Sequence, residues 1–388
     1  MARLAMLRLA ALLSLLVWLV HPAQALEAGI YRLGFLTSAA GPLALEAESF
    51  RRGAQLAVAQ INAGGLLGPG TRLDLAERDA GDDAAQAVRR YDGLLADPRV
   101  MAVACCVRTA SAAALAPLAR RDRIPLVLYG AGGGELAAPP FVYSVAGWPA
   151  ADEPGLLRRM ARALGARNAA YFMPADDAGL RARAAAARAA LEKAGLHTLG
   201  TAEAPSADTD MTVPATRLAA LRPDLIVLYA TALPSGRLVA ALRGRGWQGA
   251  IAATDALAPA ALFARVGPVL AGVPFAADFA VPDPARGAGG GRAAFTRAYE
   301  AMFAGPPDPY GARGYTAVWL VAQALRTLPG QPDRAALARA MARLGRLDAD
   351  AYDGMSMRGG QMVVRSPRFL AWTADGGLAR WTRADAAD

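Results

Sequence analysis

Side chains on which most enzymes rely are scarce in this sequence of 388 residues. It contains two histidines, two cysteines and one lysine, Lys193. One histidine lies in an N-terminal segment that we expect to be removed, which leaves His197 alone. A single histidine cannot build a histidine metal cluster or a Ser-His-acid triad. Apart from Lys193, the chain has no lysine that could serve in a Walker motif or form a Schiff base. These counts predict a protein that is not an enzyme and carries no metal or other cofactor.

Long apolar runs are also absent, except for residues 9–20. Arg3 and Arg8 precede this run, and an A-x-A pattern ending at Ala25 follows it. A charged start, a short apolar stretch and small residues at a cleavage site are typical of a secretory signal peptide. A membrane anchor is the alternative, although the run is short for a bilayer span. We expect residues 1–25 to be removed, leaving a soluble periplasmic protein that spans no membrane.

Although lysine is nearly absent, arginine gives the chain a formal net charge of +9. A basic protein could bind nucleic acid. Here the arginines are spread along segments with helical patterning, and they form no basic run with aromatic residues between them. Solvated helix faces account better for this distribution, so we expect no nucleic-acid partner.

Apolar runs alternate with helix-forming segments along the rest of the chain. We expect strands at residues 31–36, 71–78, 100–106, 124–129, 169–173, 196–202, 224–230, 250–254, 361–365 and 369–372. We expect helices at residues 46–62, 84–96, 154–164, 180–194, 293–303, 315–327 and 334–344, and another directly after residue 108. Strands alternating with helices indicate parallel sheets with right-handed crossovers. The alternation forms two successive series and the length suits two cores, so the sequence predicts an α/β fold with two lobes.

The stretch V-M-A-V-A-C-C-V-R-T-A-S, residues 100–111, carries the clearest chemical signal. A buried strand turns through Arg108 and Thr109 into a helix whose first N–H groups, around Ala110, have no partner within the helix. The hydroxyls of Thr109 and Ser111 and the Arg108 guanidinium surround these N–H groups. Such a turn is suited to a carboxylate. The alternative is ordinary N-capping by Thr109 or Ser111, with Arg108 in solvent.

A glycine-rich turn, Y-G-A-G-G-G-E-L at residues 129–136, follows the next strand. It is similar to a dinucleotide-binding fingerprint, but Glu135 stands at the last fingerprint position and the strand is not the first of its lobe. We therefore favour a turn whose backbone approaches a ligand closely, with Ala131 between the N–H groups of Gly130 and Gly132.

The two cysteines, Cys105 and Cys106, are neighbours at the end of the buried strand. They could be small buried thiols that fill space, or they could form a disulfide, which an oxidising compartment permits. Across a trans peptide the Cα atoms lie about 3.8 Å apart, so a disulfide between them would be strained. Both alternatives remain open on the sequence.

Five segments together resemble a known family. They are Y-R-L-G-F-L-T-S-A-A-G-P-L-A, F-R-R-G-A-Q-L-A-V-A-Q-I-N-A-G-G-L, R-D-A-G-D-D-A-A-Q-A-V, the stretch at residues 100–111 and G-Y-T-A-V-W-L-V-A-Q-A-L. In this order they resemble the leucine/isoleucine/valine-binding protein family, the amino-acid receptors of ABC importers. The resemblance implies the type 1 periplasmic binding protein fold, two Rossmann-like lobes with parallel sheets joined by three crossing strands. Residues 26–148 and 279–350 would form the first lobe, and residues 149–278 and 351–388 the second.

The resemblance also implies a ligand site between the lobes. In that family a hydroxyl at the position of Thr109 and the backbone of the Gly130–Gly132 turn hold the ligand carboxylate. An acid from the second lobe holds the ammonium, and Asp255 in A-A-T-D-A stands at that position. Trp148, just past the first crossing, would line the cleft.

Three departures from the family pattern bear on the ligand. Gly132 lacks the hydroxyl that the family often has there, and Ala178 replaces the aromatic residue that usually closes over the ligand. Glu46, which we expect at the rim of the cleft, stands where an aromatic residue is common. These departures argue against a standard branched-chain amino acid as the ligand. The space at Ala178 favours a solute with a bulkier side chain than valine.

We therefore expect a monomeric receptor that captures a small carboxylate-bearing solute, an amino acid or a related compound. It would deliver the solute to an ABC permease in the inner membrane. A sensory or regulatory binding protein of the same fold, which signals to a membrane partner, is the alternative.

Overall fold

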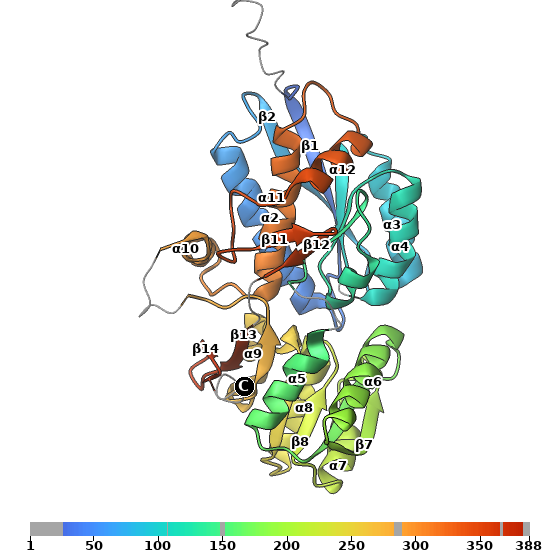
Figure 1. The fold of residues 1–388 in the computed structure, drawn as a ribbon, viewed down its shortest axis with the longest axis vertical. Helices are drawn as coiled ribbons and strands as arrows, with labels where there is room; N and C mark the ends of the chain where they lie inside the picture. The colour runs from blue at the N-terminus through green and yellow to red at the C-terminus, as the bar shows by residue number, and fades with distance from the viewer. Residues whose placement is uncertain (1–25, 107, 148–151, 283–288, 365–367, 383–388) are drawn as a thin grey trace, which may run out of the picture.

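The computed structural model describes residues 26–106, 108–147, 152–282, 289–364 and 368–382. The chain forms two α/β lobes, each built on one seven-stranded sheet. In Figure 1 the first lobe lies above and the second below. The expected signal peptide, its cleavage after Ala25 and Trp148 lie outside the described residues. Within those residues, no helix has both the length and the apolar character needed to cross a bilayer.

The first sheet has the strand order β11-β12-β5-β4-β3-β1-β2. Its strands are β1 (Gly29–Thr37), β2 (Thr71–Asp79), β3 (Val100–Cys105), β4 (Leu126–Leu128), β5 (Val142–Ser144), β11 (Ser356–Arg358) and β12 (Gln361–Val363). All pairs are parallel except β11 with β12. Every residue of β3 is buried, as expected for an interior parallel strand.

Helices cover both faces of the first sheet. Their bounds are α2 (Ala44–Ala63), α3 (Ala84–Leu95), α4 (Thr109–Arg121), α10 (Gly291–Phe303), α11 (Pro309–Arg326) and α12 (Arg334–Arg343). The buried side chains of α2, α10, α11 and α12 form one core, and those of α3 and α4 form another on the opposite face. Segments far apart in sequence, α2 and α11, therefore lie side by side (Figure 1).

The second sheet repeats this plan, with the order β14-β13-β10-β9-β8-β6-β7. Its strands are β6 (Asn168–Pro174), β7 (His197–Ala204), β8 (Leu225–Leu228), β9 (Ala250–Ala253), β10 (Phe275–Ala277), β13 (Arg368–Trp372) and β14 (Leu378–Arg380). Helices α5 (Glu153–Ala163) and α6 (Ala178–Lys193) pack on one face. The other face is covered by α7 (Thr212–Ala220), α8 (Ala232–Gly244) and α9 (Ala260–Val266).

The chain passes between the two sheets three times, after β5, after β10 and after β12. The α/β fold with two lobes and mainly parallel sheets is thus as predicted. One expected boundary is wrong: β11 and β12 belong to the first sheet, so the last passage follows Val363 rather than residue 350. The apolar pattern of a strand of three residues does not indicate which sheet the strand joins, so the sequence could not place this boundary.

Candidate solute-binding cleft

Parallel strands of both sheets end at the space between the lobes, where helices begin. In the first lobe β3 leads into α4, and in the second β6 and β8 lead into α6 and α8. The carboxyl ends of parallel strands are the usual ligand edge of such sheets. Residues from both lobes line a cavity of about 30 Å³ there: Leu43, Glu46, Arg108, Thr109, Gly130, Asp177, Leu180, Arg183, Ala230, Thr231, Thr254, Asp255, Ala256 and Tyr310. The cleft thus collects charged and hydroxyl side chains around a small central space.

The start of α4 is open toward this cavity. Arg108 is the N-cap residue, with extended backbone (ψ 126°), and its side chain makes no capping hydrogen bond. The alternative interpretation, capping by Thr109 or Ser111, is therefore wrong. Thr109 lines the cavity, while Ala110 is exposed and Ser111 is buried in the helix. Of the four residues expected at this turn, Arg108 and Thr109 reach the site.

Arg108 reaches across the cleft, but its contacts there are long. Its Nη1 donates to the carbonyl of Asp176 at 3.4 Å, and its Nε lies 4.0 Å from Oδ2 of Asp177. Its side chain is only 13% exposed, and Nε makes no hydrogen bond within the described part of the chain. Arg108 therefore lies among polar groups of the second lobe without a close ion-pair partner.

The glycine-rich turn is a short 3-10 helix, η1 (Ala131–Leu136), capped by Gly130. Gly130 lines the cavity, but its N–H donates to the carbonyl of Cys106 at 3.1 Å. The expectation that this N–H is free for a ligand is therefore wrong, because the carbonyl of Cys106, directly after β3, accepts it. Ala131 and Gly132 form the first turn of η1, and their role toward a ligand stays a prediction.

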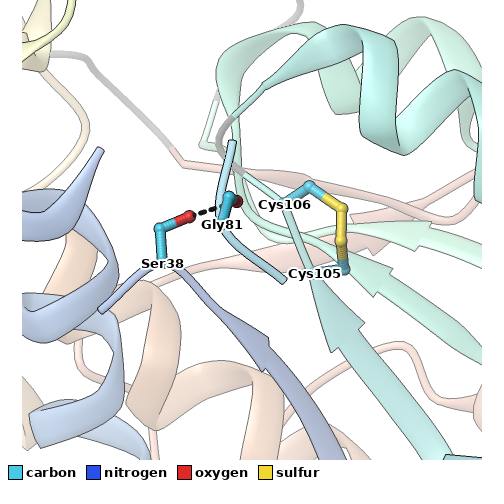
Figure 2. Close-up of a disulfide and its surroundings, with 4 residues drawn as sticks. All are labelled: Ser38, Gly81, Cys105 and Cys106. Atoms are coloured by element: carbon cyan, nitrogen blue, oxygen red, sulfur yellow. Dashed lines mark hydrogen bonds between the residues drawn. A yellow bond between two sulfur atoms is a disulfide. The ribbon is translucent and has the colours of Figure 1, made fainter. Parts of the chain in front are cut away.

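Cys105 and Cys106 form a disulfide at the end of β3, across a cis peptide bond (Figure 2). Both residues are buried among the side chains under α3 and α4. Nearby, the hydroxyl of Ser38 donates to the carbonyl of Gly81 at 2.7 Å, which ties the end of β1 to the loop after β2. The disulfide thus lies beneath the start of α4, outside the residues that line the cavity.

Glu46, on the first turn of α2, is completely buried rather than at the rim. Its Oε1 accepts from the N–H of Ala232, the first residue of α8 in the second lobe, at 2.7 Å. Its Oε2 has no hydrogen-bond partner among the described residues. Burial raises the pKa of Glu46 to about 8, and the nearby Asp255 and Asp308 act in the same direction.

Asp255 lines the cavity from the second lobe, as expected, but its carboxylate has a partner that the sequence analysis missed. Arg313 of α11 places Nη2 2.5 Å from Oδ2 of Asp255 and Nε 2.8 Å from Oδ2 of Asp278. Its Nη1 donates to the carbonyl of Tyr129 at 3.3 Å. The expected contact of Asp255 with a ligand ammonium stays a prediction, now for a carboxylate that already binds a guanidinium.

A second buried ion pair stiffens the other side of the cleft. Arg183 of α6 donates to both carboxylate oxygens of Glu153, Nε at 3.0 Å and Nη2 at 2.8 Å. Arg183 lines the cavity, and its partner holds it in a bidentate arrangement. Arg183 and Arg313 are thus paired internally, which leaves Arg108 as the cavity-lining arginine with the weakest internal partner.

The lobes also touch where α4 meets α6. A Cβ atom added to Gly179 would lie 2.8 Å from Cβ of Thr109 and 3.0 Å from its Oγ1. Only glycine permits this approach. The neighbouring Ala178 is exposed and is not among the residues that line the cavity, so its expected contact with the ligand stays a prediction.

Comparison with known proteins places this arrangement in a family. A family model described as periplasmic binding protein matches residues 31–376. The chain belongs to the periplasmic binding protein family. This membership confirms the resemblance inferred from the sequence and the expectation of a binding protein rather than an enzyme. No curated protein matches the sequence.

Solved structures of this family share the fold of the chain. The leucine binding protein of Thermotoga maritima is 16% identical, with a TM-score of 0.77 over 90% of this chain and 97% of that one. A branched-chain amino acid transporter substrate binding protein of Streptococcus pneumoniae, in complex with isoleucine, is 19% identical, with a TM-score of 0.77 over 90% and 98%. An ABC transporter solute binding protein of R. palustris, in complex with benzoate, is 16% identical, with a TM-score of 0.78 over 91% and 95%.

Proposed function

We propose that this periplasmic binding protein is the solute receptor of an ABC-type importer. It captures a small carboxylate-bearing solute between its lobes and delivers it to a permease in the inner membrane. It is exported with residues 1–25 removed after Ala25 and acts as a monomer. Similar structures described as a transporter substrate binding protein and an ABC transporter solute binding protein support the importer role.

The observation that carries the proposal is the uncapped start of α4. Thr109 and Arg108 line the cavity there, and the side chain of the N-cap residue, Arg108, makes no capping hydrogen bond. The positive end of a helix, a hydroxyl and a guanidinium together favour an anion. A carboxylate can accept two parallel hydrogen bonds from a guanidinium. The anion subsite therefore comes from the first lobe.

The second lobe completes the site. Residues after β6, β8 and β9 line the same cavity, so a solute held by α4 also touches the second lobe. A solute that contacts both lobes binds the closed form better than the open form and shifts the protein toward closure. A permease can then distinguish loaded from empty receptor by shape.

The ligand is best sought on the protein itself. Native mass spectrometry of freshly purified protein should show a bound small molecule, which calorimetry against amino acids, simple carboxylates and amides then identifies by class. We expect the tightest binder to carry a carboxylate. A tightest binder without one would contradict the anion subsite and leave only the binding fold.

The importer role has a separate test. Purified receptor, loaded with the identified solute, should retain a permease from solubilised inner membranes. Retention of a sensory membrane protein instead would contradict the importer and favour the signalling alternative.

A further inference from the structure

Glu46 is the cavity residue whose chemistry the proposed anion subsite leaves unused. Its side chain is fully buried, and it belongs to α2 of the first lobe while bonding α8 of the second. Oε1 is engaged by the N–H of Ala232, but Oε2 has no protein partner in the described chain. A buried carboxyl oxygen without a partner is costly unless something else binds it.

We propose that Glu46 is a specificity-determining residue that binds the solute as a neutral carboxylic acid, its Oε2 hydroxyl donating a hydrogen bond to an oxygen of the solute. This inference rests on the proposed function, because it requires a solute in the cleft. It adds a donor beside Arg108 and Thr109, and it assigns that donor to a residue usually counted as an acceptor.

The hydrogen bond to Ala232 indicates where the proton resides. An N–H donates to Oε1, so Oε1 acts as the carbonyl oxygen of the acid and the proton lies on Oε2. Oε2 is therefore the donor, and it belongs to a side chain that lines the cavity. The solute atom that meets it must accept a hydrogen bond.

The groups around Glu46 do not favour its ionisation. Asp255 on η3 (Asp255–Leu257) and Asp308 before α11 are acids that raise its pKa further after burial, and Tyr129 and Tyr310 carry no positive charge. The α8 N-terminus lowers the pKa through Ala232, but burial is the larger cause. Arg313 is bound to Asp255 and Asp278, and Arg183 is bound to Glu153. Arg108 lines the same cavity from the start of α4.

A neutral acid and an ionised one select different solutes. A neutral Glu46 donates to a carboxylate or carbonyl oxygen, whereas an ionised Glu46 repels a carboxylate and attracts an ammonium. Asp255 is held by Arg313, and Oε2 of Glu46 is a buried carboxyl oxygen of a cavity-lining residue that has no hydrogen-bond partner in the described chain. Among the described cavity residues, the combination favours a solute that presents oxygen atoms to both α4 and α2.

The binding test uses benzoate, a carboxylate without an ammonium, and L-leucine, which has one. Calorimetry from about pH 6 to about pH 9 should show benzoate binding to the wild type most tightly at low pH, with affinity falling up to about tenfold per pH unit once Glu46 ionises. Glu46→Gln, whose amide N–H also donates, should keep the affinity and lose the pH dependence. Glu135→Gln, an exposed acid on η1, should behave as wild type.

A ligand-free test follows the proton itself. Because the folded pKa of Glu46 is raised to about 8, the folded state holds this proton when the unfolded state has released it. The acid therefore costs stability increasingly as pH rises from its unfolded pKa toward 8. The melting temperature of Glu46→Gln relative to wild type should rise over this range and then level off.

The outcomes separate the two proposals. If benzoate binds with the same pH profile in wild type and Glu46→Gln, the donor role is overturned and the receptor function stands. If the melting-temperature difference does not change with pH, Glu46 is ionised throughout and the inference is wrong. If neither benzoate nor leucine binds at any pH, the carboxylate-binding function fails, and the donor role fails with it.

Discussion

Arg313 of the first lobe and Asp255 of the second form a buried ion pair, with Nη2 2.5 Å from Oδ2. Asp278, at the end of β10, shares the same guanidinium and accepts the N–H of Gly147 at 2.8 Å. Arg313 thus joins Asp255, which lines the cavity, to Asp278, which follows β10. Through Asp278 it is also linked to Gly147, in the segment that follows β5. The cleft and the passages between the lobes are one polar network.

Removing Asp255 should therefore affect stability even without a solute. Breaking a buried ion pair lowers the free energy of unfolding by about 3–5 kcal/mol. Because Asp255→Ala leaves Arg313 paired with Asp278, we expect a loss near the lower end of this range. Urea unfolding measures this loss. Asp348→Ala, which breaks an exposed pair with Arg326 at 2.7 Å, is the control and should cost at most about 1 kcal/mol. Equal losses of unfolding free energy in the two variants would show that the buried pair stabilises the protein no more than the exposed pair does.

Thr109→Val tests the anion subsite at the start of α4. The substitution keeps the shape of the side chain and removes its hydroxyl, so a charged group of the solute loses one hydrogen bond. Such a loss costs about 1.5–3 kcal/mol, or about 10- to 150-fold in affinity. Calorimetry with the solute identified by mass spectrometry measures it. Thr216→Val, on the exposed face of α7, should bind as wild type, and unchanged binding by Thr109→Val would remove the residue from the site.

Gly179→Ala tests the contact between α4 of the first lobe and α6 of the second. The added Cβ would lie 2.8 Å from Cβ of Thr109, so α4 and α6 must move apart. We expect weaker solute binding and a larger radius of gyration in small-angle X-ray scattering with solute present. Gly155→Ala, near the start of α5 with no atom within 4 Å of the added Cβ, is the matched control. Identical scattering for both variants would mean that this contact does not limit closure.

The sequence predicted the longer strands and most helices, because alternating apolar runs and helical periodicity reflect burial directly. It missed four strands of three residues each, β5, β10, β11 and β14. It placed α11 too late, at Tyr315 rather than Pro309. The segment P-Y-G-A-R-G looks like a loop, but Asp308 caps it by accepting from the N–H of Gly311, and Pro309 fits the first helical position. Its glycines are there for close packing against α2 rather than for a turn.

The sequence predicted where the candidate site lies better than it predicted which groups its residues contact. Thr109, Arg108, Glu46 and Asp255 do meet at one cavity, because strand ends converge at one edge of each sheet. Partners from distant segments could not be inferred from local patterns. Arg313 offered one signal: an arginine among small and apolar residues of a helix requires a buried acid.

The disulfide between Cys105 and Cys106 predicts a simple thiol count. Alkylation of unfolded, unreduced protein should modify no cysteine, and alkylation after reduction should modify two. Mass spectrometry reads both results. Two modified cysteines before reduction would contradict the disulfide and favour the alternative of two buried thiols.

The packing of α2 on α11 gives the last prediction. A Cβ on Gly53 would collide with the carbonyl oxygen of Gly311, and one on Gly314 with that of Phe50. Both obstacles are backbone atoms in rigid helices, so the helices must separate to accept even one methyl group. Overpacking of this kind costs about 1–3 kcal/mol or more, and we expect Gly53→Ala to lower the midpoint of urea unfolding accordingly.

The matched control is Gly93→Ala on α3, where an added Cβ meets nothing within 4 Å. Alanine in an exposed helix interior stabilises by about 0.5–1 kcal/mol relative to glycine, so this variant should be more stable than wild type. A change from glycine to alanine should therefore lower the stability at position 53 and raise it at position 93, if the α2–α11 contact is as close as described. Stabilisation by Gly53→Ala would show instead that the helices lie further apart and that Glu46 and Arg313, which they position, are less firmly held.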